Sequence, residues 1–384
     1  MASQRVAVAP DIIRWARQRS GRPPEELNRF PYAKWEAGEA QPTFRQLEEY
    51  AKATYTPVGF LFLQEPPQEK LPIPDFRTFG DRPARTPSPD LLDSIYACEQ
   101  RQAWYHDYAE AAGAGPVPLV ASQSLQTPPE SAAAALRGEL GFGLDRRVEF
   151  SNWSEAFAGL RDHAEDAGVL VMTSGVVGSN TRRVLDPDEF RGFALVDDLA
   201  PVVFVNGADT KAAQIFTLAH ELAHVSLGES AVSRADLSDL DDANASERWC
   251  NQVAAELLVP RESLLDAYDP PADLTQELER LAKYYKVSTL VVLRRIADTG
   301  LMDRATYRSA FNADYQRVRE LQAAGASQGG SFYNTTPVRV SKRFARALIA
   351  DTLEGRTSHR EAFHLLGSKK FSAFEGLSHK LGVA

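Results

Sequence analysis

The sequence contains few cysteines and no long apolar segment. Among its 384 residues, Cys98 and Cys250 are the two cysteines, too few for a framework of disulfide bonds, which favours a reducing, cytoplasmic location. No segment approaches the roughly 18 consecutive apolar residues of a membrane-spanning helix. The N-terminal segment MASQRVAVAPDIIRWARQRS has no uninterrupted apolar stretch, so we expect neither a signal peptide nor membrane contact.

An excess of positive charge is also absent. The chain has 43 Lys and Arg against 52 Asp and Glu, which gives a net charge of −9. This balance disfavours non-specific binding to nucleic acid or to an acidic membrane, although a local basic surface remains compatible with it. The length predicts two or three domains, and a composition that is 43% hydrophobic and 25% charged is typical of a globular protein.

Helical patterns and a proline-rich connector make up the first part of the chain. Several short amphipathic patterns fill residues 10–63. Residues 64–90 are dense in proline and lack periodicity, which predicts an extended connector. The connector also contains apolar residues, among them Ile73 and Phe76, so we expect part of it to lie on a protein surface.

A small sheet followed by a long helix is predicted next. Short β-branched and aromatic segments predict three strands, over residues 168–175, 190–197 and 201–207. Residues 209–228 carry a long helical pattern, with Asp209 expected as its N-cap and Gly228 just after its end. The remainder is helical in pattern, apart from a loop expected over 323–337. The predicted fold class is therefore α+β and mainly helical.

The long helical pattern contains the segment His-Glu-Leu-Ala-His. Its histidines, His220 and His224, are four residues apart, which places both rings on one helix face, where they can hold one metal ion. Glu221 projects beside them and can accept a proton from a water molecule on the metal. The alternative is a helix that carries two histidines by coincidence. The preceding strands and the flanking apolar residues favour the metal site.

A catalytic zinc site needs a third protein ligand and one open position. The next helical segment offers Glu247 and Glu256, which are about 900° of helix rotation apart and therefore on opposite sides. We favour Glu247, because Asn251 lies one turn further on the same face and can hydrogen-bond a ligand histidine. Glu256 remains the weaker candidate. Two imidazoles and a carboxylate favour Zn2+, with Mn2+ as a possible substitute.

Several of these segments resemble the ImmA/IrrE family of zinc metallo-endopeptidases. The resemblance covers roughly residues 150–265 and is carried by FRGFAL, PVVFVN, QIFTLAHELAH and CNQVAAELLVP. It implies a zincin-like fold in which His220, His224 and Glu247 are the zinc ligands and Glu221 is the catalytic base. Asn251 matches the position of a residue that supports a ligand histidine. Members of the family cleave or inactivate a partner repressor in stress response, mobile-element induction or toxin–antitoxin control.

The N-terminal segment LNRFPYAKWEAGEAQPTFRQLEEYAKA resembles a helix-turn-helix of the Xre/Cro type. Only seven residues separate Leu27 from Trp35, with Pro31 among them, about half of what a second helix, a turn and a recognition helix need. Residues 1–65 contain nine Lys and Arg against eight Asp and Glu, which is little charge for binding phosphates. We expect a degenerate module that contacts protein, and DNA binding stays open.

Two functional hypotheses follow. In the first, the chain is a cytoplasmic zinc endopeptidase of restricted specificity that cleaves a partner repressor or toxin, with a homodimer as one candidate assembly. In the second, it is a non-catalytic regulator or antitoxin that uses the same fold to bind DNA or a partner. Glu221 favours the first, because a pseudoenzyme does not need a general base.

Four domains are expected. Residues 1–65 form a helix-turn-helix-like module and residues 66–150 a connector with helices. Residues 151–265 form a metallopeptidase domain, and residues 266–384 a helical C-terminal region.

Overall fold

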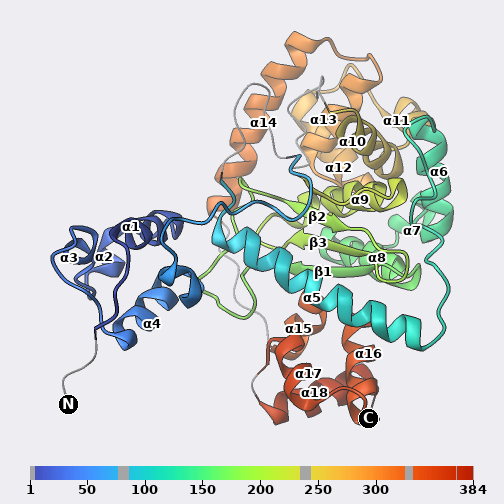
Figure 1. The fold of residues 1–384 in the computed structure, drawn as a ribbon. Helices are drawn as coiled ribbons and strands as arrows, with labels where there is room; N and C mark the ends of the chain where they lie inside the picture. Colours follow the sequence, from blue (N-terminus) through green and yellow to red (C-terminus); the bar gives the residue numbers. More distant parts are fainter. Residues whose placement is uncertain (1–4, 77–85, 234–243, 325–331, 369, 384) are drawn as a thin grey trace. The chain divides into compact units, whose positions relative to one another are not determined.

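The computed structural model describes residues 5–76, 86–233, 244–324, 332–368 and 370–383 (Figure 1). These residues form many helices and one four-stranded mixed sheet, in agreement with the predicted α+β, mainly helical class. The chain divides into an N-terminal unit, Met1–Pro72 with Arg85–Ile95, and a large unit, Ile73–Ala84 with Tyr96–Ala384. Each unit is considered separately below.

The N-terminal unit is a small helical core. Its helices are α1 (Pro10–Arg19), α2 (Pro24–Leu27), α3 (Tyr32–Glu36), α4 (Phe44–Ala53) and the 3-10 helix Val58–Phe62. Ile12, Trp35, Leu47 and Tyr50 are buried together in its core. The segment that resembles a shortened helix-turn-helix contains α2 and α3, which are four and five residues long. Each is about one turn, so neither has the length of a recognition helix.

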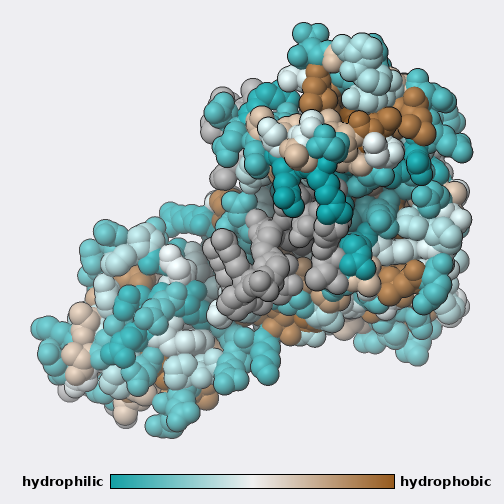
Figure 2. All heavy atoms as spheres, turned by 90° about the horizontal axis from the view of Figure 1, so that it is seen from above, coloured by the Kyte–Doolittle hydropathy of each residue, from teal (hydrophilic) through white to brown (hydrophobic). Residues whose placement is uncertain are grey.

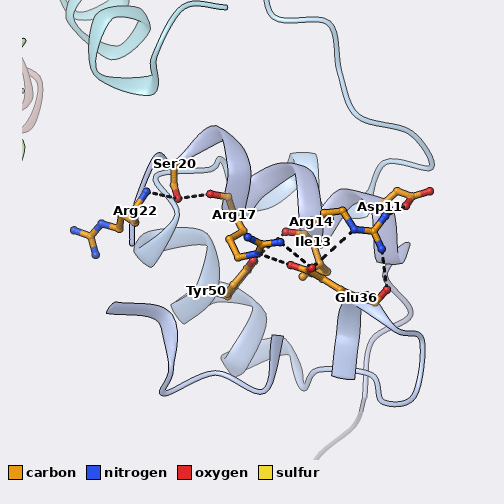
Figure 3. Close-up of polar contacts among 8 residues, drawn as sticks. All are labelled: Asp11, Ile13, Arg14, Arg17, Ser20, Arg22, Glu36 and Tyr50. Carbon is orange, nitrogen blue, oxygen red and sulfur yellow. Dashed lines mark hydrogen bonds and ion pairs between the residues drawn. The ribbon is translucent and has the colours of Figure 1, made fainter. Parts of the chain in front are cut away.

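Polar contacts connect α1 to its neighbours in this unit (Figure 3). Arg17 donates from its guanidinium to both carboxylate oxygens of Glu36, over 2.8 and 3.1 Å. The Tyr50 hydroxyl donates to the backbone carbonyl of Ile13 over 2.9 Å, within the core. Because Glu36 ends α3 and Tyr50 lies on α4, these contacts fix α1 against both helices.

The large unit is built around the sheet. Its strands are β1 (Leu170–Ser174), β2 (Gly192–Leu195), β3 (Val202–Asn206) and β4 (Ala231–Ser233), in the order β1-β3-β2-β4. β1 and β3 are parallel, whereas β2 is antiparallel to β3 and to β4. Three strands match the predicted segments. The fourth, β4, was not predicted, because it has only three residues and takes its conformation from pairing with β2.

Helices cover both faces of this sheet (Figure 1). α8 (Trp153–Asp166) and α9 (Lys211–Leu227) pack on one face, where Val203 and Val205 point into the main core. On the other face, Met172 contacts Cys98 of α5 (Pro89–Ala111), with 3.6 Å between the sulfur atoms. Every strand residue is buried, as expected for a sheet with helices on both sides.

Helix α9 corresponds to the predicted long helix, with one correction at its start. Its N-cap is Thr210, whose hydroxyl accepts a hydrogen bond from the Ala213 amide over 3.2 Å, and not Asp209. An N-cap side chain accepts from the amide of the second or third helical residue, and the chain enters the helical conformation one residue later than the pattern indicates. The helix ends before Gly228 as predicted, and this glycine has a φ of 76°.

The remaining elements of the large unit are helical. They are α6 (Pro129–Leu140), α7 (Leu144–Arg147), α10 (Ala245–Leu258), α11 (Arg261–Ala267), α12 (Leu274–Tyr285), α13 (Thr289–Asp298), α14 (Arg304–Ala324), α15 (Phe332–Val340), α16 (Lys342–Leu353), α17 (His359–Leu366) and α18 (Phe371–Leu381). The loop predicted over 323–337 is partly wrong, since α14 extends to Ala324 and α15 begins at Phe332 and contains Pro337. Residues 325–331 lie outside the described part of the chain. Packing of α15 against β1 supplies stability that its local sequence does not predict.

The surface visible in Figure 2 is mainly hydrophilic, with apolar residues in small scattered groups. Within the described parts of the chain, no helix combines the length and the apolar composition needed to cross a membrane. One hydrophobic core extends in sequence from Leu119 to Tyr307 and includes buried residues of α9 and α10. The predicted metal-binding residues lie on these two helices.

Candidate metal centre

Three side chains converge between α9 and α10. His220 and His224 come from consecutive turns of α9, and Glu247 comes from the first turn of α10. The two histidine Nε2 atoms are 3.2 Å apart, and the Glu247 carboxylate oxygens lie 3.2 Å from the first and 3.0 Å from the second. All three side chains are buried. The helical spacing of the motif therefore brings together three side chains that could hold one metal ion.

This set fits a metal ion in its geometry and in its chemistry. In a tetrahedral zinc site with bonds of about 2.0–2.1 Å, two ligand atoms lie about 3.3 Å apart. The observed separations of 3.0–3.2 Å are close to that edge length. Both histidine rings present Nε2 to the common point, because these two atoms lie 3.2 Å from each other and each is within 3.2 Å of a Glu247 carboxylate oxygen. These residues would hold the metal.

The charges in the cluster suit a cation. Burial alone would raise the pKa of Glu247, but the neighbouring His220 and His224 hold it well below its usual range. Burial likewise opposes protonation of His220, yet the Glu247 carboxylate raises its pKa overall. Burial lowers the pKa of His224, which favours a neutral ring. The ionised carboxylate and the neutral ring of His224 are forms that bind metal ions, whereas a proton on His220 would be released when a metal binds.

Glu221 lies beside this cluster, close to the charged groups of His220 and Glu247 and to the hydroxyl of Ser233. It is fully buried. Burial raises the pKa of Glu221 to about 8. A carboxyl group with a pKa near neutrality can both accept and release a proton under physiological conditions. Its position next to three ligand atoms therefore suits proton transfer.

Two residues near the glutamates were not identified from the sequence. Ser233 of β4 donates from its hydroxyl to Glu247 Oε1 over 3.2 Å. Gly192 of β2 lies directly against Glu221, because a Cβ at that position would be 2.8 Å from Glu221 Oε1. A glycine within a strand is a known signal of close approach and could have indicated Gly192. Ser233 belongs to no motif and carries no comparable signal.

The other predicted residues lie on α10. Asn251 is buried one turn after Glu247, close enough to His220 that a hydrogen bond between their side chains contributes to the raised pKa of this histidine. Its support of a ligand histidine stays a prediction. The weaker ligand candidate, Glu256, points away from the cluster, where it forms an ion pair with Arg295 and accepts from the Arg261 amide.

The connector reaches the same region of the large unit. The Phe76 amide donates to the Val232 carbonyl and the Val232 amide donates to the Pro74 carbonyl, each over 3.0 Å. Asp75 thereby forms a parallel bridge with Val232 on β4. The Phe76 ring lies 6.0 Å from the His224 ring, between their centres. This part of the connector does lie on a protein surface, as its apolar residues indicated.

Comparison with known families supports a metallopeptidase type of domain. Residues 164–297 match the family model Peptidase_M78, the IrrE N-terminal-like domain. This range contains the four strands, α9 and α10, and it supports the resemblance drawn from the sequence motifs. Residues 340–380 match a domain of unknown function, DUF8813. The chain has no match among curated proteins.

Proposed function

We propose that the protein is a zinc-dependent endopeptidase of restricted specificity that cleaves a partner regulatory protein. The observation that carries this proposal is the convergence of His220, His224 and Glu247 beside Glu221, whose carboxylate is fully buried. The cluster lies inside the range that matches a peptidase family. The histidine nitrogens and the carboxylate oxygens are buried and have the spacing of ligand atoms in a tetrahedral site, which favours zinc among the metals that they can bind.

Each residue has a role in this proposal. His220 and His224 bind through Nε2 and Glu247 through its carboxylate. When bound by these residues, zinc would supply Lewis-acid chemistry, which lowers the pKa of water and polarises a peptide carbonyl. The Glu221 carboxylate accepts a proton as water attacks and passes it to the departing amine. Ser233 donates to Glu247 Oε1 and so orients the carboxylate of this ligand.

The partner that we propose is a transcriptional repressor or a toxin. Two features support this choice: the resemblance of the motifs to a family that inactivates repressors, and an N-terminal unit whose sequence resembles a helix-turn-helix module. Burial of all three proposed ligands supports restricted specificity, because a buried site is not open to every extended chain. The N-terminal unit is a candidate for partner recognition.

The test compares the wild type with Glu221→Gln and His224→Ala. Bound zinc is measured in each purified protein, and each is co-expressed with the protein encoded beside it. We expect about one zinc per chain in the wild type and in Glu221→Gln, a large loss of zinc in His224→Ala, and a cleaved partner only with the wild type. Equal action of the wild type and Glu221→Gln on the partner, without cleavage, would instead support the non-catalytic regulator.

A further inference from the structure

A cavity lies in the C-terminal part of the large unit, at the edge of the sheet opposite to β4. Helices α15 and α16 pack against β1 at this edge, and α17 and α18 pack against these two helices (Figure 1). The cavity has a volume of about 890 Å³ and is lined by Ser179, in the loop after β1, and by Arg360, Phe363 and His364 of α17. The metal-binding cluster contacts β4, so the two sites are on different edges of the sheet.

The cavity is lined by positive and neutral polar groups. Arg360 and His364 lie on its wall, and none of the described residues that line it is acidic. Arg339 of α15 adds to this positive group, because its guanidinium donates to the Ser179 hydroxyl over 3.0 Å. That hydroxyl donates to the Gly367 carbonyl, also over 3.0 Å. The loop after β1 is therefore joined both to α15 and to the end of α17.

A further arginine, Arg101 of α5, lies close to Arg339. The Arg101 guanidinium is buried and donates to the Leu365 carbonyl over 3.0 Å. Burial lowers the pKa of Arg101, and burial together with the charge of Arg101 lowers the pKa of Arg339. Within the described residues, no carboxylate forms an ion pair with Arg101, Arg339 or Arg360. Positive charges that are partly removed from water and repel each other are stabilised by a nearby anion.

Other basic side chains of the same helices have acidic partners. Lys342 pairs with Asp162 over 2.8 Å, and Arg356 pairs with Asp351 over 2.6 Å. The cavity therefore offers a compact set of positive groups and not a long basic surface. A nucleic-acid backbone requires a row of positive contacts, whereas a concave site of roughly 300–1,000 Å³ is typical for a small ligand.

Phe363 gives the cavity an aromatic surface. Its side chain is half-buried and lines the cavity. The ring is held by contacts with Phe371 and Phe374 of α18, with 6.4 and 5.9 Å between the ring centres. An aromatic ring that is fixed in place next to positive groups is suited to a ligand with a flat apolar portion and a negative charge.

We propose that this cavity binds a small organic phosphate, with its phosphoryl group at Arg339, Arg360 and His364 and its aromatic or apolar portion against Phe363. Guanidinium groups present paired N–H donors that match the oxygen atoms of a phosphate. Three of the four residues lie within residues 340–380, the range that matches a domain of unknown function. Binding of this ligand does not depend on the proposed peptidase function, because the site uses none of the metal-binding residues.

The test measures binding of AMP to the full-length protein by isothermal titration calorimetry. Arg360→Glu reverses the charge of an exposed residue on the cavity wall. Arg346→Glu makes the same change at an exposed position of α16 that does not line the cavity, and serves as the matched control. Phe363→Leu removes the ring and keeps an apolar side chain. Adenosine, inorganic phosphate and a single-stranded adenine oligonucleotide are the comparison ligands.

We expect AMP to bind the wild type, and Arg360→Glu to weaken this binding by at least about tenfold, the effect of one lost hydrogen bond to a charged group. Arg346→Glu should change the affinity by less than about twofold. Adenosine and inorganic phosphate should each bind at least about tenfold more weakly than AMP, because each lacks one half of the proposed contacts. Phe363→Leu should weaken binding of AMP and leave that of inorganic phosphate unchanged.

Three results would overturn the proposal. The first is no binding of AMP to the wild type. The second is an equal affinity of Arg360→Glu and the wild type for AMP, which would place the ligand elsewhere, for example on a bound metal ion. The third is a higher affinity for the oligonucleotide than for AMP, which would assign the cavity to nucleic acid.

Discussion

Gly192 and Glu221 are in such close contact that residue 192 has no space for a side chain. A Cβ added to Gly192 would lie 2.8 Å from Glu221 Oε1 and 2.7 Å from the methyl group of Thr217. Both distances are below normal van der Waals contact, so α9 and β2 can approach this closely only because residue 192 is glycine. The position of the proposed base therefore depends on a residue in the neighbouring strand.

Gly192→Ala should displace the Glu221 carboxylate and leave the three zinc ligands in place. A displacement of about 1 Å at a catalytic group lowers activity by roughly a hundredfold. We therefore expect cleavage of the partner to fall by about that factor, with zinc content unchanged. Gly138→Ala, in the open on α6, is the matched control and should leave cleavage unaffected. Wild-type cleavage by Gly192→Ala would contradict this account of the contact.

Glu247 and Glu256 lie on the same helix and make different contacts, so their substitution should have separate effects. Glu247→Ala removes a proposed ligand, and we expect zinc affinity to fall by several orders of magnitude, with loss of the rise in melting temperature that added zinc gives the wild type. Glu256→Gln weakens the ion pair with Arg295 and should lower stability while zinc binding persists. Zinc titrations followed by thermal unfolding measure both effects, and zinc-induced stabilisation of Glu247→Ala would contradict the proposed ligand set.

The parts of the site that follow a helical period could be predicted from the sequence. His220 and His224 share a face because they are four residues apart, and the same rotation places Glu247 and Glu256 on opposite sides of α10. The end of α9 was also predictable, because glycine adopts a positive φ without the strain that other residues have there. Gly228 adopts this conformation directly after the helix. These features depend only on local geometry.

The remaining parts depend on contacts between distant segments. β4 has three residues, and nothing within Ala231–Ser233 distinguishes a strand from a loop until β2 lies beside it. The contact of Phe76 with His224 joins residues 148 positions apart in the chain. The connector sequence indicated that some residue would lie on a surface, but it could not identify which surface. Helix α15, similarly, depends on packing against β1.

Arginine side chains bind the carbonyl groups at the end of α10, and the buried Arg147 should contribute most to stability. It donates to the carbonyls of Leu257 and Leu258, and its side chain is almost completely inaccessible. Arg147→Met would leave these carbonyls without their partner, so we expect the free energy of unfolding to fall by about 1–3 kcal/mol. The adjacent, exposed Arg146→Met is the control and should change it by less than about 0.5 kcal/mol. Equal losses in denaturant titrations of the two variants would contradict this assignment.

The contact between His106 on α5 and Asp197 after β2 should make stability depend on pH. Nδ1 of His106 lies 2.9 Å from both carboxylate oxygens of Asp197, and this hydrogen bond raises the pKa of His106. Burial opposes ionisation of Asp197, but the hydrogen bonds from His106 and from the amides of Leu199 and Ala200 hold its pKa below the usual range. The pair is therefore fully charged in the folded protein over a window of mildly acidic pH.

The raised pKa of His106 and the lowered pKa of Asp197 determine how the stability of the folded protein changes with pH. A raised histidine pKa stabilises the folded state below the unfolded pKa of about 6.5, and this contribution is lost as pH rises through the folded value. The contribution of Asp197 is present above about pH 3.9 and is lost as pH falls. His106→Gln should thus be less stable than the wild type at about pH 5.5, by under about 1 kcal/mol because the pair is partly exposed, and nearly equal to it at about pH 9. Urea titrations at both values measure the difference, with His379→Gln, exposed on α18, as control. A larger deficit at the higher pH would show that the ion pair does not stabilise the fold.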